Sequence, residues 1–318
     1  MLILERQKSS QLLYYQALLR RIYEHDVEYE DFHKQLLSLE AGHSGEQRTD
    51  REFIDIALTH PHTLLYNLEL LNAQGTSHQI DSILVTPNFL LILEIKNMNG
   101  TLFYNATHHE FGRIRHNGQV DIFSDPFAQS HRHQTVLERL LHHWGFMLPV
   151  MYVVVVANSN VRFDQSLQHY PILQLSGLRL YIERLFEKYS IEYVNTTELE
   201  KLSTYLLSTL HRPAVKRFVA PERLQKGVLC AKCQFTEVMV YVNRTWYCPK
   251  CGERNKKAVH QALHDYRLLI SDRITNKEFR DFVGIESMQV ASKILSRLGY
   301  EKIGDKRGRV YIISEDCL

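Results

Sequence analysis

Two apolar stretches separated by a short turn constrain the fold of this chain more than any other feature. They cover residues 80–85 and 89–95, and a Pro–Asn pair typical of turns lies between them. This pattern predicts a hairpin of two strands. A charge inside strands this apolar costs free energy unless it is paired or bound to a cation. The hairpin nevertheless carries three charged residues, Asp81, Glu94 and Lys96.

The register of this hairpin predicts a metal site. If the turn is symmetric, opposed residues have numbers that sum to 175, as those of Asp81 and Glu94 do. Lys96 then projects from the same face of its strand as Glu94. Two adjacent carboxylates raise each other's pKa unless a cation intervenes. Mg²⁺ or Mn²⁺ would fit, with the Ile95 carbonyl as a further ligand and Lys96 beside it to orient or help deprotonate a water molecule.

Attack of a metal-activated water on a phosphodiester is the reaction that suits this arrangement. Spacing alone leaves a second interpretation open. In it, Asp81 and Glu94 face solvent in a half-exposed hairpin, and Lys96 is an ion-pair partner.

The rest of the first two hundred residues alternates between helical and strand patterns. Apolar residues at helical spacing predict two helices within residues 7–40, and the glycines at 42 and 45 predict a break before a further helix begins at Glu46. The other elements are strands expected at 63–71, 101–104, 111–123 (around an Asn–Gly turn) and 150–157, and helices expected at 127–144, 175–189 and 196–210.

Three motifs in order resemble the nuclease-related (NERD) domain, a branch of the PD-(D/E)xK nuclease superfamily. They are GHSGEQ at 42–47, HQIDSILVTPNFLLILEIKN at 78–97 and DPFAQSHRH at 125–133. The resemblance covers roughly residues 40–160. It implies an α/β fold of the restriction-endonuclease-like kind, a mixed sheet flanked by helices, and metal-dependent cleavage of DNA.

The resemblance also assigns roles to individual residues. It makes Asp81 the metal-binding acid and Glu94 and Lys96 the ExK pair. Glu46 matches the acid on the helix before the sheet, and Gln129 matches a glutamine near the active site on the helix after it. From local sequence alone, Glu46 could equally be a first-turn acid favoured by the helix dipole, and Gln129 an ordinary surface amide.

Four paired cysteines predict a structural zinc site. Two Cys-x2-Cys pairs are separated by fourteen residues, and the intervening sequence alternates apolar and polar residues about Asn243. Four thiolates in two such turns form a closed tetrahedral Zn²⁺ site, here in a zinc ribbon. A redox or iron–sulfur site is the less favoured alternative, and the ribbon could contact nucleic acid or a protein partner. The ligands are Cys230, Cys233, Cys248 and Cys251.

The C-terminal residues 258–318 have the layout of winged-helix DNA-binding domains. A helix over 277–283, a turn at Gly284 and a helix over 287–298 would be followed by a two-stranded wing, 300–303 and 309–313. Between residues 256 and 309, twelve Lys or Arg outnumber seven Asp or Glu. The alternative is a small helical protein-interaction domain. The expected DNA contacts are Lys293, Arg297, Lys306, Arg307 and Arg309.

Composition narrows the class of protein. The chain has 318 residues, of which 44% are hydrophobic and 23% charged, which is typical of a globular protein of two or three domains. Its net charge of +2 indicates no class of partner. The apolar stretches are too short for a membrane span, and the N-terminus has no secretory pattern. We therefore expect a cytoplasmic protein whose cysteines bind metal instead of forming disulfides.

The leading function is a Mg-dependent deoxyribonuclease whose zinc ribbon and winged helix engage DNA. The alternatives are a non-catalytic DNA-binding or regulatory protein that uses the nuclease-like fold as a scaffold, and a structural adaptor. The sequence leaves the oligomeric state open. The expected domains are an N-terminal helical segment (1–40), the nuclease-like domain with a helical extension (41–212), the zinc ribbon (226–256) and the winged-helix-like domain (258–318).

Overall fold

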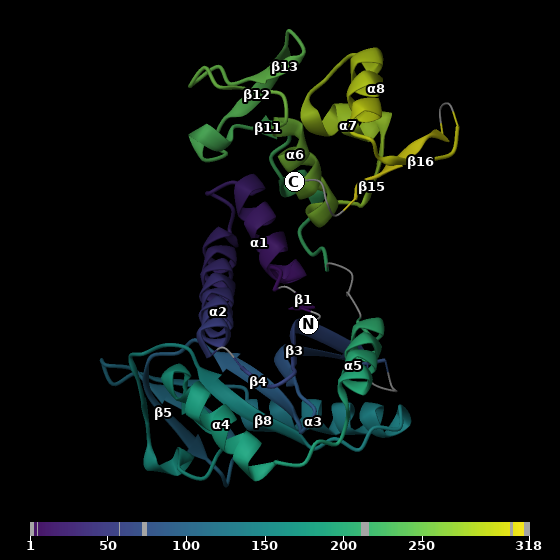
Figure 1. The fold of residues 1–318 in the computed structure, drawn as a ribbon. Helices are drawn as coiled ribbons and strands as arrows, with labels where there is room; N and C mark the ends of the chain where they lie inside the picture. Colours follow the sequence, from purple (N-terminus) through teal and green to yellow (C-terminus); the bar gives the residue numbers. More distant parts are fainter. Residues whose placement is uncertain are drawn as a thin grey trace. The chain divides into compact units, whose positions relative to one another are not determined.

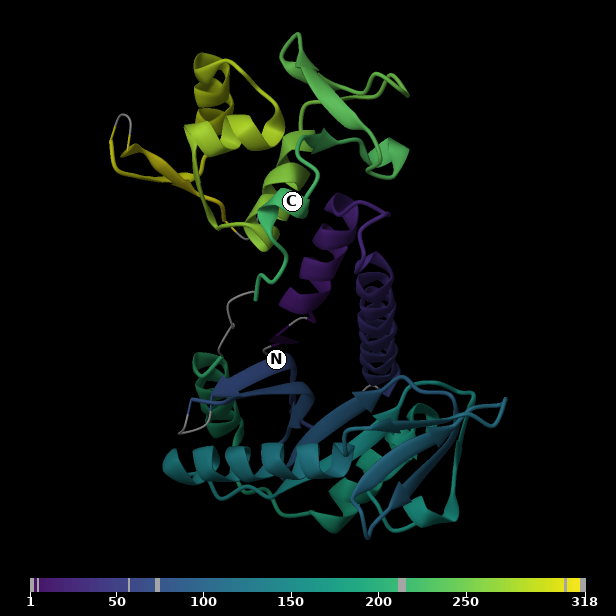
Figure 2. The same ribbon diagram turned by 180° about the vertical axis from the view of Figure 1, so that it is seen from behind.

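The computed structural model describes residues 3–4, 6–56, 58–71, 75–210, 216–305 and 308–314. The chain divides into two compact units (Figures 1 and 2). Unit 1 comprises residues 1–8 and 39–213, and unit 2 comprises residues 9–38 and 214–318. Within the described residues, no helix has the length and apolar character needed to cross a membrane.

A six-stranded mixed sheet forms the centre of unit 1. Its strand order is β1-β2-β3-β4-β8-β10, in which β2, β3 and β4 are antiparallel neighbours while β8 runs parallel to both β4 and β10. The predicted hairpin is its third and fourth strands. The strands are β1 (Ile3–Leu4), β2 (Thr63–Leu71), β3 (Ser77–Val85), β4 (Leu90–Lys96), β8 (Val150–Val156) and β10 (Ile172–Gln174).

Helices cover both faces of this sheet. On one face α3 (Pro126–His143) and α5 (Thr196–Ser208) pack against a core that includes Ile83 and Ile92. On the other face α4 (Leu178–Lys188) and the end of α2 (Tyr29–Ile56) pack against Leu84, Leu91 and neighbouring residues. Figure 1 shows α4 in front of the sheet, and Figure 2 shows α3 in front of it from behind. The α/β fold with helices on both faces is confirmed.

A second, four-stranded sheet of order β7-β6-β5-β9 follows the hairpin in the chain. Its inner face packs Leu102 and Phe111 against Phe127 at the start of α3. The predicted Asn–Gly turn joins β6 to β7, where Gly118 has the positive φ of 81° that such turns require. The strands are β5 (Gly100–Asn105), β6 (Glu110–Ile114), β7 (Val120–Phe123) and β9 (Val161–Phe163).

The predicted break at residues 41–45 is wrong, because α2 runs unbroken from Tyr29 to Ile56. A glycine inside a helix costs roughly 1 kcal/mol relative to alanine, so its presence calls for a reason. A Cβ atom on Gly45 would lie 2.7 Å from Asn97 Cβ, just after β4. Gly45 therefore allows the helix to approach the end of the hairpin closely, whereas Gly42 has open space around it.

Unit 2 contains α1 (Ser10–Arg21), a four-stranded sheet that carries the cysteines, and a C-terminal group of helices with a three-stranded sheet of order β15-β17-β16. Ser287 caps α8 as predicted. The predicted boundary at 212–221 lies partly outside the described residues. The elements are β11 (Val228–Leu229), β12 (Val238–Val242), β13 (Thr245–Tyr247), β14 (Arg254–Asn255), α6 (Ala258–Leu269), β15 (Arg273–Thr275), α7 (Asn276–Val283), α8 (Met288–Arg297), β16 (Glu301–Ile303) and β17 (Val310–Ile312).

Short 3-10 helices lie in both units. They are η1 (Gln165–Leu167), η2 (Leu175–Gly177), η3 (Pro221–Arg223) and η4 (Ala231–Cys233).

Buried ion pairs join distant segments within unit 2. Arg21 on α1 and Asp265 on α6 form an ion pair of 2.8 Å in which each side chain is 1% exposed. Arg20 reaches the other oxygen of the same carboxylate at 2.7 Å. Because removal of one partner would leave a buried charge, these pairs tie α1 to α6.

Candidate active site

The β3–β4 hairpin has the predicted register. Ser82 lies opposite Leu93, and Val85 lies opposite Leu90, so the ladder follows the sum of 175. Asp81 and Glu94 are the next opposed positions after the last paired residues. The Ile95 N–H donates a hydrogen bond of 2.8 Å to Asp81 Oδ2. Asp81 is therefore held directly against the backbone of the neighbouring strand.

Glu94 is buried, with 1% of its surface exposed. Lys96 Nζ donates to Glu94 Oε1 at 2.7 Å, whereas Glu94 Oε2 is buried and accepts no hydrogen bond from any residue that the structure describes. Burial raises the pKa of Glu94, and the Asp81 charge raises it further. Burial also raises the pKa of Asp81, with the charge of Glu46 as the second cause. The interpretation in which both acids face solvent is therefore wrong for Glu94.

The ladder between β2 and β3 opens at Asp81. Tyr66 pairs with Ser82 and Leu68 with Ile80, but the opposed pair Asn67 and Asp81 is skipped. Asn67 lies inside β2 with a positive φ of 50°, and the pairing with β3 is interrupted there. A local interruption of this kind re-aims side chains, and such features concentrate near functional sites. Asp81 is therefore paired in neither the β2–β3 ladder nor the β3–β4 ladder.

Glu46 lies in the middle of α2, so the first-turn interpretation of this acid is wrong. Its Oε2 atom forms an ion pair of 2.8 Å with Arg6 Nη1. Arg6 also binds Asp50, one helical turn after Glu46, at 2.6 Å. Burial raises the pKa of Glu46, and Arg6 opposes this rise. Sequence reasoning missed Arg6 and Asp50, because no local pattern around residue 6 indicates a partner 40 or more positions away.

Gln129 and His133 lie one turn apart on α3. The Gln129 side chain contributes to lowering the pKa of Glu94, against the larger effect of burial, which raises it. His133 was given no role from the sequence, yet it is only 4% exposed, and its Nδ1 atom has no hydrogen-bond partner in the described part of the chain. Burial lowers the pKa of His133 to about 4, and the charges of His78, Arg132 and Lys96 contribute. His133 is therefore a neutral imidazole near Lys96.

The donors at the hairpin suit a hard divalent cation. The register opposes Asp81 and Glu94, and within the described residues the buried Glu94 Oε2 accepts no hydrogen bond, which leaves it available to a cation. The Ile95 carbonyl lies on the same edge of its strand as the N–H that binds Asp81. Mg²⁺ commonly binds through one or two carboxylates and keeps several water ligands. The residues present thus fit such an ion.

The comparisons with known proteins agree with this geometry. A family model described as "Nuclease-related domain" (NERD) matches residues 41–157. The chain carries a nuclease-related domain. The matched residues include Glu46, the complete hairpin, Gln129 and β8. Searches of curated proteins and of solved structures found no match.

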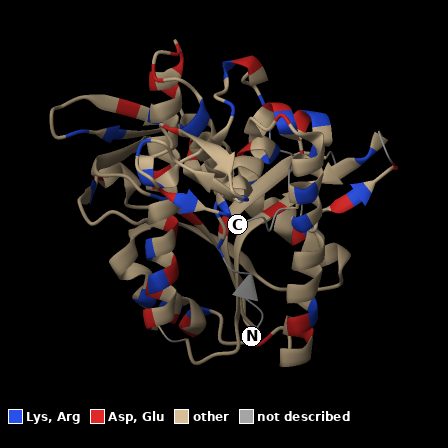
Figure 3. Ribbon diagram, turned by 90° about the horizontal axis from the view of Figure 1, so that it is seen from above, with Lys and Arg blue, Asp and Glu red and all other residues tan. Residues whose placement is uncertain are grey.

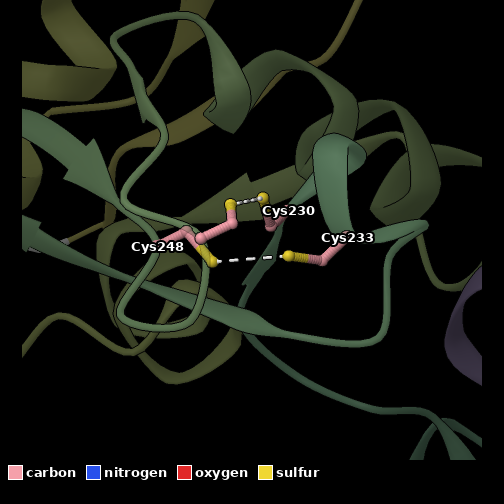
Figure 4. Close-up of side chains that lie close together, drawn as sticks. Cys230, Cys233 and Cys248 are labelled. Carbon is pink, nitrogen blue, oxygen red and sulfur yellow. Dashed lines mark hydrogen bonds between the residues drawn. The ribbon is translucent and has the colours of Figure 1, made fainter.

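Outside the nuclease-related domain, the four cysteines of unit 2 converge as predicted. Their sulfur atoms all lie within 4.8 Å of one another, and they are the sole group of three or more His, Cys, Asp or Glu side chains found so close together in the described part of the chain. Figure 4 shows the sulfurs in two facing pairs. The pairs are Cys230–Cys251 at 3.7 Å and Cys233–Cys248 at 3.8 Å. Zinc with Zn–S distances of about 2.3 Å requires sulfur separations of about 3.8 Å.

The expected DNA-contacting residues of the tail are only partly described. Lys293 and Arg297 are exposed and one turn apart on α8, and Arg309 is half-buried just before β17. Lys306 and Arg307 lie outside the described residues. Lysines and arginines are interspersed with acids along the ribbon (Figure 3). An electrostatic contact with DNA would therefore depend on local groups such as the α8 pair.

Proposed function

We propose that this protein is a metal-dependent nuclease that hydrolyses DNA phosphodiester bonds. The observation that carries the proposal is the buried arrangement of Asp81, Glu94 and Lys96, in which Glu94 Oε2 accepts no hydrogen bond of normal geometry from the described residues. Burying an unpaired acceptor costs about 1–3 kcal/mol. Bound metal would remove that cost, and the match to the nuclease-related domain supports the same chemistry.

Each residue has a distinct role in this proposal. Asp81, Glu94 and the Ile95 carbonyl hold Mg²⁺ or Mn²⁺, which when bound lowers the pKa of a water molecule and polarises the phosphate. Burial alone would lower the pKa of Lys96, but Glu94 more than offsets this effect, so the pKa is raised. Lys96 is therefore an ammonium ion that orients water and stabilises developing negative charge. Glu46 and Gln129 support this arrangement.

Replacing Lys96 with methionine is expected to lower the cleavage rate by about 10²–10³-fold, because the side chain keeps its length but loses its charge. The assay follows cleavage of duplex and single-stranded DNA, and of RNA, with Mg²⁺, with Mn²⁺ and with EDTA. Lys188→Met, at an exposed site on α4, is the matched control. Equal rates for wild type and Lys96→Met would remove Lys96 from the mechanism. Tight DNA binding without cleavage by the wild type would favour the non-catalytic scaffold.

We further propose that unit 2 holds zinc through the four cysteines and binds DNA through a winged-helix-like tail. The order of α6, β15, α7, α8, β16 and β17 supports the tail assignment. The exposed pair Lys293 and Arg297 on α8 supplies positive charge for backbone phosphates. Zinc would stabilise a ribbon too small to have a core of its own.

Neutralising Lys293 and Arg297 together, as glutamines, is expected to weaken DNA binding and flatten its dependence on salt. Each lost phosphate contact lowers the slope of log K against log [salt] by about 0.9, so we expect a change of about 1.8. Fluorescence anisotropy between low and physiological salt measures it. The double variant Lys188→Gln and Lys201→Gln removes the same charge from α4 and α5 and should keep the wild-type slope. An unchanged slope in the α8 variant would remove α8 from the DNA interface.

A further inference from the structure

The Arg6 guanidinium lies in a cage of five oxygen atoms within unit 1. All five of its N–H donors are used: Nη1 on Glu46 Oε2 and Asn67 Oδ1, Nε and Nη2 on the Asp50 carboxylate, and Nη2 on Ser82 Oγ. These contacts measure 2.6–2.9 Å. The Arg6 side chain is 4% exposed. The fold therefore holds this cation in place.

The cage has the chemistry of a site for a hard divalent cation. Carboxylate, amide and hydroxyl oxygens are the ligands that Mg²⁺ and Mn²⁺ prefer. The cage adjoins the β3–β4 hairpin. Ser82 follows Asp81 directly in β3, and Asn67 lies opposite Asp81 where the β2–β3 ladder is interrupted. The charges of Glu46 and Asp81 also act on each other. Two adjacent positions for cations thus share one site, and Arg6 fills one of them.

The charges of the ionised site match a single divalent ion. Four negative and two positive side chains leave two negative charges, which one Mg²⁺ neutralises. A second divalent ion in place of Arg6 would have to overcome the loss of five charge-assisted hydrogen bonds. The four acids are Glu46, Asp50, Asp81 and Glu94, and the two cations are Arg6 and Lys96.

We propose that Arg6 takes the place of a second metal ion, so that the nuclease site binds one divalent cation, at Asp81 and Glu94. This inference rests on the proposed function of those two acids as metal ligands. Arg6 acts as a positioning residue: it keeps Glu46 and Asp50 away from the metal and fixes α2 beside the hairpin.

The test counts bound Mn²⁺ by electron paramagnetic resonance, using the zinc-loaded full-length protein. The wild type is expected to bind one Mn²⁺ per chain. Arg6→Gln is expected to bind two, because the oxygen cage loses its cation. Arg113→Gln, which breaks another arginine–acid pair of unit 1 (to Asp121, 2.6 Å), is the control and should bind one. Two Mn²⁺ ions in the wild type, or one in a folded Arg6→Gln variant, would overturn the role of Arg6.

A second variant decides the question if Arg6→Gln fails to fold. Asp50→Asn keeps an oxygen acceptor for Arg6, and it should bind one Mn²⁺ with an affinity within about threefold of wild type, because Asp50 is not a ligand. Loss of Mn²⁺ from Asp50→Asn would overturn the inference and leave the proposed function standing. A wild type that binds no Mn²⁺, or a single Mn²⁺ that survives Asp81→Asn, would overturn both.

Discussion

Replacing Asp81 with asparagine is expected to abolish metal-dependent cleavage, with a fall in rate of at least about 10³-fold. The substitution preserves the size of the side chain and an oxygen acceptor for the Ile95 N–H, which Asp81 Oδ2 now binds at 2.8 Å. It removes the negative charge that faces Glu94. Metal binding should fall together with cleavage, because one of two carboxylate ligands becomes a neutral amide.

Three measurements separate this loss from a folding defect. Thermal unfolding without metal should show an Asp81→Asn protein at least as stable as wild type, because burial raises the pKa of Asp81 and its charge is costly in the folded state. Mn²⁺ binding should be lost in the same sample. Asp55→Asn, an exposed acid on α2, should retain wild-type cleavage. Wild-type cleavage by Asp81→Asn would show that the reaction occurs elsewhere.

Removing zinc is expected to unfold the ribbon and to loosen the C-terminal part of unit 2. Cys230 and Cys248 belong to the same buried core as Trp246, Phe279 and Leu295. Structural zinc contributes roughly 10–16 kcal/mol of binding free energy in zinc-finger peptides, so its loss is expected to cost several kcal/mol here. The C-terminal helices would lose part of the core on which they pack.

The fluorescence of Trp246 offers a direct measurement. This side chain is 1% exposed, and its emission should shift to the red when a chelator removes zinc or when Cys248 is replaced with serine. Metal analysis should find one zinc per chain in the wild type and none in Cys248→Ser. Cys317→Ser, at a cysteine outside the described residues, is the control and should keep zinc. An unchanged emission in zinc-free protein would contradict a structural role for the metal.

The sequence by itself determined the hairpin and the opposition of Asp81 and Glu94. A strand repeats every two residues, so the turn between the apolar stretches sets which side chains meet. The observed ladder, with Ser82 opposite Leu93, follows that rule. The cysteine cluster is local in the same sense, because two short turns at the ends of paired strands bring the sulfurs together.

Only the tertiary structure decided how these local pieces are supported. The two glycines predicted a helix break, but α2 continues through both of them, and Gly45 leaves room there for Asn97. Arg6 binds Glu46 and Ser82 across 40 and 76 positions of the chain. Such contacts depend on how whole helices and strands pack together, so the periodicity of the sequence does not predict them. The same packing buries Glu94 Oε2 without a hydrogen bond to any described residue, because the neighbours of this atom come from elements distant in the sequence.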